Sequence, residues 1–197
     1  MSGDVHVRFC ESLRVRFLRA THLGCGFGRE EEAQRFYGEL EERLRKFGLE
    51  LAADKTRVIP FSRYRRGETS FDFLGFEFRW GTDRKGQARL QRRTSRKKFR
   101  SSVKRVAEWC KKNRHRRVGE QFKRLNAKLR GYYNYYGVRG NYASLHEFFQ
   151  QVQRLHLKWL NRRSQRQSYN WAGYRALLQH FALARPRIAA RPTLVYR

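Results

Sequence analysis

The spacing of apolar residues changes period twice along the chain, and these changes limit the folds that it can adopt. Between residues 30 and 47 apolar side chains recur every three or four positions, which predicts an amphipathic helix. Glutamates at its start and Gly48 after its end favour the same limits. Residues 49 to 60 then predict two short extended segments around a turn at Asp54, with Pro60 ending the second.

Alternation with period two replaces the helical pattern in SFDFLGFEFRW, residues 70 to 80, and predicts β-structure. An extra residue reverses the phase of alternation, so we expect a β-bulge at Leu74 and Gly75 that puts the aromatic rings of this segment on one side. The segment GTDRKGQ then predicts a turn and ARLQRR a partner strand, which together make a β-hairpin. The rings fall into two sets of opposite parity, Phe71 with Phe73, and Phe76 with Phe78 and Trp80.

The remainder of the chain returns to the helical period, with stripes over residues 95–110, 122–136, 144–160 and 171–181. Ser95 suits the N-cap of the first helix, and Ser144 with Glu147 forms a capping-box pattern at the start of the third. We therefore predict an α+β protein. Residues 1–94 hold the first helix and the hairpin, residues 95–187 form an α-helical bundle, and residues 188–197 are a tail that shows no strong period.

Charge is distributed unevenly over these parts. The chain carries 46 Lys and Arg against 17 Asp and Glu, for a formal net charge of +29. The first fifty residues are neutral overall, whereas residues 101 to 197 carry twenty-two basic and three acidic side chains. Such an excess repels itself unless a polyanion neutralises it, so the expected partner is a nucleic acid that binds the second half of the chain.

Other classes of protein fit the sequence less well. A membrane-spanning helix needs about eighteen apolar residues in a row, which the sequence lacks, and the N-terminus does not resemble a secretory signal. We expect a cytoplasmic protein with no membrane partner. Cys10, Cys25 and Cys110 are far apart, so they predict neither a disulfide framework nor a metal site.

The segment LRGYYNYYGVRGNY, residues 129 to 142, interleaves five tyrosines with two arginines and contains no acidic residue. RNA recognition combines phosphate neutralisation with the stacking of unpaired bases on aromatic rings, and this segment offers both. Three of the tyrosines continue the helical stripe and favour core packing, with base stacking as the alternative; they are Tyr132, Tyr133 and Tyr136. The better RNA-binding candidates are Arg130, Tyr135, Arg139 and Tyr142.

Two further basic clusters flank the predicted bundle. Arg162, Arg163 and Arg166 follow its third helix, where we expect phosphate contacts; the alternative is that they cap helix carbonyls in solvent. Lys97 and Lys98 lie just inside the first helix, and simple solvation is a nearly equal alternative for them.

These segments, in this order, resemble a known family. The span from KTRVIPF to FDFLGFEF is similar to the end of the palm of group II intron reverse transcriptases, and LRGYYNYYGV with LKWLNRRSQR is similar to their maturase-specific thumb domain. The resemblance covers about residues 25 to 187. It implies binding of structured intron RNA, in support of splicing, or of a template–primer duplex, and a primer-grip-like role for Phe73, Leu74 and Gly75.

One part of the family pattern is missing. Family polymerases hold two metal ions with the paired aspartates of Tyr-Ala-Asp-Asp, whereas Cys10, Glu11 and Ser12 stand at the corresponding place here. We therefore predict no catalytic or metal-binding residue and no cofactor, with Mg²⁺ needed only by the RNA or by an intact family member. The preferred function is that of a polymerase-inactive, maturase-type RNA-binding fragment.

Two alternatives remain open. In the first, the chain is the C-terminal half of a split RNA-directed DNA polymerase, which a complementing reverse-transcriptase chain completes. In the second, it is a degenerate protein that binds nucleic acid without specificity.

Overall fold

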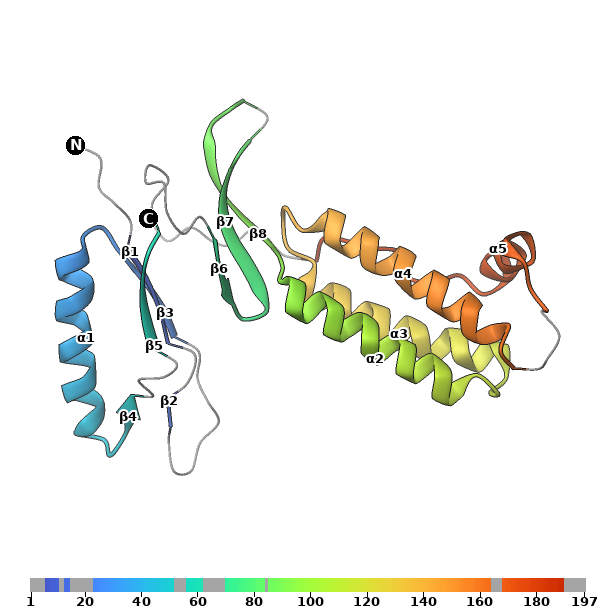
Figure 1. Cartoon of the computed structure of the whole chain (residues 1–197), viewed down its shortest axis with the longest axis horizontal. Coiled ribbons are helices and arrows are strands. Elements are labelled where there is room, and N and C mark those ends of the chain that lie inside the picture. Colours follow the sequence, from blue (N-terminus) through green and yellow to red (C-terminus); the bar gives the residue numbers. More distant parts are fainter. Residues whose placement is uncertain are drawn as a thin grey trace. The chain divides into compact units, whose positions relative to one another are not determined.

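The computed structural model of the chain describes residues 6–10, 13–14, 23–51, 56–61, 70–83, 85–163 and 168–189. The chain divides into two compact units, Met1–Gln91 and Arg92–Arg197. Strands predominate in the first unit and helices in the second (Figure 1). This mixture confirms the predicted α+β class.

The first unit contains an antiparallel sheet with one long helix beside it. Its strands are β1 (His6–Cys10), β3 (Leu23–Phe27) and β5 (Thr56–Pro60), and β1 lies in the centre, in the order β3-β1-β5. Helix α1 (Glu30–Arg45) contacts all of these strands, and a second small sheet pairs β2 (Leu13–Arg14) with β4 (Glu50–Leu51).

Helix α1 has the ends that its sequence predicts. Glu30, Glu31 and Glu32 occupy its first turn, where negative charge is favourable to the helix dipole. At the other end the N–H of Leu49 donates to the carbonyl of Leu44 at 3.0 Å, and Gly48 adopts a left-handed φ of 67°. This is a Schellman cap, which glycine favours because it has no Cβ.

A second antiparallel sheet is formed by β6 (Ser70–Phe73), β7 (Phe76–Thr82) and β8 (Ala88–Thr94), in that order. The predicted β-bulge is wrong, because Leu74 and Gly75 form a two-residue turn between β6 and β7. Their φ values of 51° and 79° are those of a type I′ turn, whose twist matches the twist of paired strands.

The expected gathering of the aromatic rings is nevertheless correct. Residues directly opposite in an antiparallel pair point to the same face, and Phe71 is paired with Phe78. Their rings stack with centroids 5.2 Å apart, and Trp80 stacks on Phe61 at 5.3 Å. These rings form a small core on one face of the sheet. The predicted turn between β7 and β8 is also present, where Asp83 Oδ1 accepts hydrogen bonds from two backbone N–H groups.

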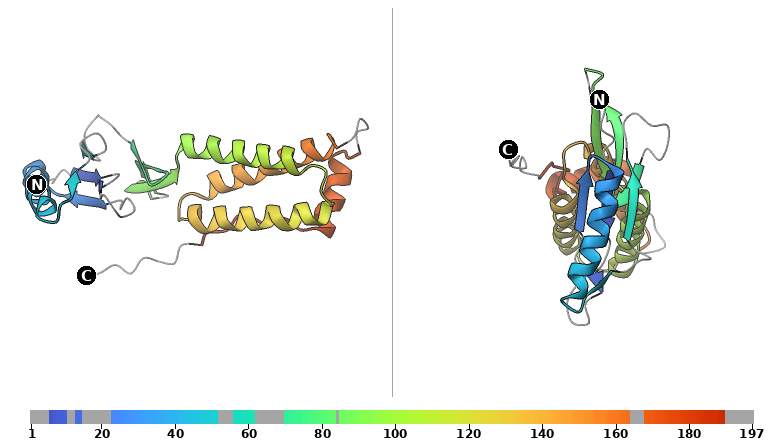
Figure 2. Two further views of the ribbon diagram at one scale, coloured as in Figure 1. Left: turned by 90° about the horizontal axis from the view of Figure 1, so that it is seen from below. Right: turned by 90° about the vertical axis from the view of Figure 1, so that its left-hand side faces the viewer.

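The second unit is a bundle of helices that confirms the four predicted stripes. Helices α2 and α4 run in one direction and α3 in the other, with the shorter α5 at one end (Figure 2). Their bounds are α2 Arg96–Asn113, α3 Val118–Tyr136, α4 Tyr142–Leu160 and α5 Trp171–His180.

The starts of α2 and α4 differ from the predicted caps. Ser95 occupies the N-cap position of α2, but its side chain makes no capping hydrogen bond. The capping box predicted at Ser144 and Glu147 is wrong, because α4 begins at Tyr142 and Asn141 holds the N-cap position.

The side chain of Asn141 is fully buried and joins three segments of the bundle. Its Oδ1 accepts a hydrogen bond from the N–H of Thr94 at 2.8 Å, and its Nδ2 donates to Thr94 Oγ1 at 2.9 Å and to the carbonyl of Tyr136 at 2.8 Å. The start of α2, the end of α3 and the start of α4 therefore meet at one end of the bundle, which we call the corner end.

Residues 182 to 189 run back along α3 toward the corner end (Figure 2). Asn126 on α3 bonds the carbonyl of Ala182 and the N–H of Ala184, and the N–H of Ala189 donates to the carbonyl of Gly137 at 2.7 Å. The segment is therefore held in place up to Ala189, which includes the first two residues of the predicted tail, 188–197. Residues 190–197 lie outside the described residues.

Candidate nucleic-acid interface

The corner end carries most of the predicted RNA-binding residues. Helix α3 ends at Tyr136 and α4 begins at Tyr142, so the side chains near this loop come from two helices and the turn between them. Tyr135 and Tyr142 are 54% and 51% exposed, and the ring of Tyr142 stacks beside His146 at 6.2 Å. Four basic side chains are also exposed. Arg139 lies in the loop between the helices, Lys97 and Lys98 lie in the first turn of α2, and Arg130 lies on α3 more than one turn before Tyr135.

The five tyrosines of this segment divide as the helical spacing predicts. Tyr133 and Tyr136 are buried in the bundle, Tyr132 is half-buried, and Tyr135 and Tyr142 face solvent. The core-packing interpretation is therefore confirmed for Tyr133 and Tyr136. The two exposed rings lie at the surface, where the bases of an RNA can reach them.

The arginines after α4 lie at the opposite end of the bundle. Helix α4 has 19 residues, so its ends are about 28 Å apart at 1.5 Å per residue. The guanidinium of Arg163 donates to the carbonyl of Arg116 at 3.0 Å, which ties the end of α4 to the turn between α2 and α3. Arg162 lies 5.5 Å from the ring centre of Trp159, and Arg166 lies outside the described residues. The arginines after α4 and the RNA-binding candidates of the corner end therefore do not form one surface.

The predicted primer-grip-like residues occupy the tip of the β6–β7 hairpin in the first unit. Phe73 is buried in the aromatic core, Leu74 is 42% exposed in the turn, and Gly75 completes the turn. The backbone geometry thus presents one apolar side chain to solvent at this tip.

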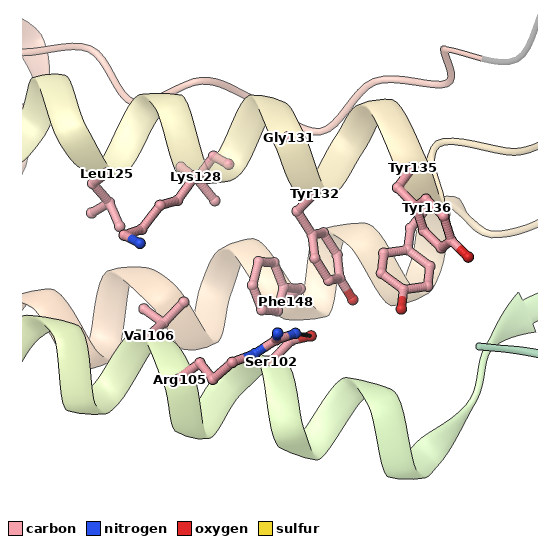
Figure 3. Close-up of a pocket in the computed structure, with 11 residues that line it drawn as sticks. Ser102, Arg105, Val106, Leu125, Lys128, Gly131, Tyr132, Tyr135, Tyr136 and Phe148 are labelled. Carbon is pink, nitrogen blue, oxygen red and sulfur yellow. Dashed lines mark hydrogen bonds between the residues drawn. The ribbon is translucent and has the colours of Figure 1, made fainter. Parts of the chain in front are cut away.

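A groove of about 330 Å³ opens between α2 and α3 in the second unit (Figure 3). Phe148 of α4 forms part of its floor, and apolar residues of α2 and α3 line the sides. Polar groups lie among them on Ser102, Arg105 and Lys128 and on three tyrosines, Tyr132, Tyr135 and Tyr136. A cavity of this size, with mostly apolar walls and a few polar groups, is typical of small-ligand sites.

Aromatic rings run in a continuous row from the floor of the groove to the surface. Tyr132 stacks on Phe148 with ring centroids 3.8 Å apart and planes 16° apart. Tyr136 lies 4.6 Å from Tyr132, and Tyr135 meets Tyr136 edge to face at 4.7 Å. The exposed ring of Tyr135 is therefore supported by packed rings behind it.

The groove is electrostatically positive. Arg105 donates a hydrogen bond to Ser102 Oγ at 3.2 Å, and Lys128 Nζ lies 5.5 Å from the ring centre of Trp109. Within the described parts of the chain neither cation forms an ion pair with a carboxylate. Burial raises the pKa of Tyr132 and of Tyr136, so both hydroxyl groups stay uncharged at neutral pH.

Arg105 and Lys128 were not among the site residues predicted from the sequence. The sequence spacing gave one signal for Lys128, which lies three residues after Leu125 and four before Tyr132 and therefore borders the apolar stripe of α3, with its own side chain exposed. A lysine in an apolar stripe indicates either a snorkelling surface residue or a charge that faces a cavity. The partner arginine on α2 has no comparable signal, because only the packing of the helices brings the two together.

A buried histidine–tyrosine pair lies in the bundle interior. His156 is fully buried, its Nδ1 lies 3.0 Å from the hydroxyl of Tyr174, and burial lowers its pKa to about 4. The pair joins α4 to α5. No group of His, Cys, Asp and Glu suited to a metal ion is present among the residues that the structure describes. Cys10 ends β1, whereas Glu11 and Ser12 lie outside the described residues.

In the described ranges, every helix is too short or too polar to cross a lipid bilayer. No protein-family model matches the chain, and no curated protein matches it in sequence. The geometry and charge of the second unit are therefore the basis on which its function can be inferred.

Proposed function

We propose that this chain is a maturase-type RNA-binding protein of the cytoplasm, related to the C-terminal part of group II intron reverse transcriptases. Its helical unit binds structured intron RNA and stabilises the folded RNA for splicing. The observation that carries the proposal is the corner end, where Tyr135 and Tyr142 are exposed beside Arg139 in a unit with few acidic side chains.

The chemistry of the corner end suits RNA better than other polyanions. Lysines and arginines neutralise phosphates of any nucleic acid, and this contribution carries no sequence or shape information. Exposed tyrosine rings add stacking on unpaired bases, which structured RNA presents in loops and bulges. A tyrosine hydroxyl also reaches the 2′-OH that distinguishes RNA from DNA.

The family relation assigns a role to each unit. Residues 1–94 are then a remnant of the reverse-transcriptase palm, with the β6–β7 hairpin as its primer grip, and residues 95–187 are the maturase-specific thumb. Two features support this assignment: the tight turn at Leu74 and Gly75 that presents an apolar tip, and the helices whose loop exposes tyrosine beside arginine.

A binding protein can assist splicing without a catalytic group of its own. A ligand shifts a folding equilibrium only by the difference between its affinities for the two states. Preference for the active RNA fold by about 2.7 kcal/mol would enrich that fold about a hundredfold. Mg²⁺ then serves the RNA, and the protein needs no cofactor.

Binding measurements across a salt series test the proposal. The purified protein is titrated with a group II intron RNA and with an unrelated RNA of equal length. We expect a preference for the intron that persists when salt weakens the phosphate contacts. Combining Tyr135→Leu, Arg139→Gln and Tyr142→Leu should lower the intron affinity by about 2 to 4 kcal/mol, because two stacking rings and a cation are lost.

The matched control is Arg175→Gln, which removes an exposed cation from α5, away from the corner end. It should leave the preference for the intron unchanged. Equal affinity for both RNAs at every salt concentration would contradict the proposal and indicate a non-specific binder.

One observation favours a second candidate function. The antiparallel pairing of β1 with β3, next to α1, is consistent with part of a polymerase palm that a second chain completes. The chain would then be the C-terminal half of a split RNA-directed DNA polymerase that binds a template–primer duplex. Primer extension by a mixture of this chain with a fragment that supplies the fingers and both aspartates would support it, and inactivity of such a complex would contradict it.

A further inference from the structure

The groove between α2 and α3 is built from groups of two kinds that face the same space. Arg105 on α2 and Lys128 on α3 reach into the gap between the helices from opposite sides (Figure 3). Tyr132 and Tyr136 line the same gap, above the ring of Phe148. A row of packed aromatic rings therefore lies next to two cations that make no ion pair in the described parts of the chain.

We propose that this groove binds a single unpaired nucleotide of the RNA, with its base against the tyrosine row and its phosphate between Arg105 and Lys128. The inference rests on the proposed function, because it assumes that RNA is the ligand. It goes further by assigning a pocket that adjoins the exposed corner end at Tyr135 and by naming the part of the RNA that enters it.

Size and charge both favour a nucleotide as the occupant. The volume of about 330 Å³ lies at the lower end of the range for small-ligand sites, which fits one nucleotide and excludes a double helix. A paired base is stacked between its neighbours, so only a bulged or looped base can leave the RNA and enter a pocket. The two cations complement the one phosphate that such a base brings with it.

Gly131 offers a direct way to close the groove without disturbing the fold. It lines the groove within α3, and a Cβ added at this position meets no atom within 4 Å. Glycine is also a poor helix former, so Gly131→Leu should preserve or improve the stability of α3. The added side chain would occupy the space that the base requires.

The matched control is Gly38→Leu, which places the same side chain at an open, exposed position inside α1. For the cations, Arg105→Gln and Lys128→Gln are compared with Lys123→Gln, which removes an exposed charge from α3 outside the groove lining. Circular dichroism of each variant verifies that the helices are retained.

The probe is an RNA hairpin with one bulged 2-aminopurine, compared with the same hairpin without the bulge. We expect the protein to bind the bulged hairpin roughly tenfold more tightly, and the 2-aminopurine fluorescence to change on binding. Gly131→Leu should abolish both effects, while Gly38→Leu should leave both intact. Each cation variant should reduce the preference for the bulge and lower the salt slope by about one.

The outcomes separate the pocket from the proposed function. If the unchanged protein shows no preference for the bulged hairpin, and Gly131→Leu still prefers intron RNA, the pocket is overturned and the RNA-binding function stands. Loss of intron preference in the unchanged protein would overturn both. Displacement of the 2-aminopurine signal by an acidic peptide, without competition from mononucleotides, would show that the groove takes protein instead and would also overturn the inference.

Discussion

Replacement of Asn141 by alanine should destabilise the helical unit more than any surface change. The buried amide forms hydrogen bonds of 2.8 to 2.9 Å with the N–H of Thr94, with Thr94 Oγ1 and with the carbonyl of Tyr136. A net contribution of about 1 kcal/mol for each bond gives about 3 kcal/mol in all. The buried partners left without a hydrogen bond add to this cost. We therefore expect a loss of about 3 to 4 kcal/mol, a large share of the about 5 to 15 kcal/mol that stabilises a typical domain.

The measurement is chemical unfolding followed by tryptophan fluorescence. Replacing Trp80, the tryptophan of the first unit, by phenylalanine leaves Trp109, Trp159 and Trp171 as reporters of the second unit. Both the reference protein and the Asn141→Ala variant carry this change, and the free energies of unfolding are compared.

The control for this prediction is Asn134→Ala on α3, where the exposed amide accepts one long hydrogen bond, 3.3 Å, from Arg187. We expect a change below about 0.5 kcal/mol for this variant. Equal effects of the two alanine variants would refute this prediction, because the expected difference comes from the burial of Asn141 and from its three hydrogen-bond partners.

Three further changes test other parts of the structure. Gly137→Ala should destabilise the bundle by about 1 to 3 kcal/mol in the same unfolding assay. The added methyl group would overlap the carbonyl oxygen of Tyr133 and lie 2.8 Å from the carbonyl oxygen of Arg187. A free energy of unfolding equal to that of the wild-type protein would contradict this. Leu74→Asn should stabilise the hairpin by about 0.5 to 1 kcal/mol, since asparagine adopts positive φ more readily than leucine. Thermal unfolding monitored by Trp80 fluorescence should show a higher midpoint temperature, and an unchanged or lower midpoint would count against the assigned turn. Burial holds the pKa of His156 at about 4, below its ordinary value of 6.5, so the unfolded chain binds more protons between these values. This contribution to the free energy of unfolding should be fully present above about pH 6.5 and fall by roughly 3 kcal/mol as the pH decreases to 4. If the free energy of unfolding of a His156→Gln variant decreased by the same amount over this pH range, His156 would not be its cause.

Much of the local structure was predictable because it depends on neighbours in the sequence. The helical spacing and Gly48 were sufficient for α1 and its cap, and the four apolar stripes were sufficient for the helices of the second unit. The same spacing separated buried Tyr133 and Tyr136 from exposed Tyr135. The spacing of apolar residues depends only on neighbouring turns of a helix or neighbouring residues of a strand, so it can be read directly from the sequence.

The incorrect predictions concern positions where distant contacts outweigh local preference. A leucine in the left-handed region was not expected, and pairing of β6 with β7 makes a turn of what the alternation alone suggested was a bulge. Ser144 has a favourable capping pattern, yet α4 begins earlier because Asn141 bonds to groups that precede it by up to 47 residues.

The candidate sites depend most strongly on tertiary structure. The charge distribution alone predicts a polyanionic partner for the second half of the chain, because the count of basic residues does not depend on their arrangement. The length of α4 already separates Tyr142 from Arg162 and Arg163, whereas only the directions of the helices bring Tyr135 to the same end as Tyr142. Only their packing leaves a groove in which Arg105 and Lys128 face the same space, since these side chains lie on separate helices whose mutual position no local pattern encodes.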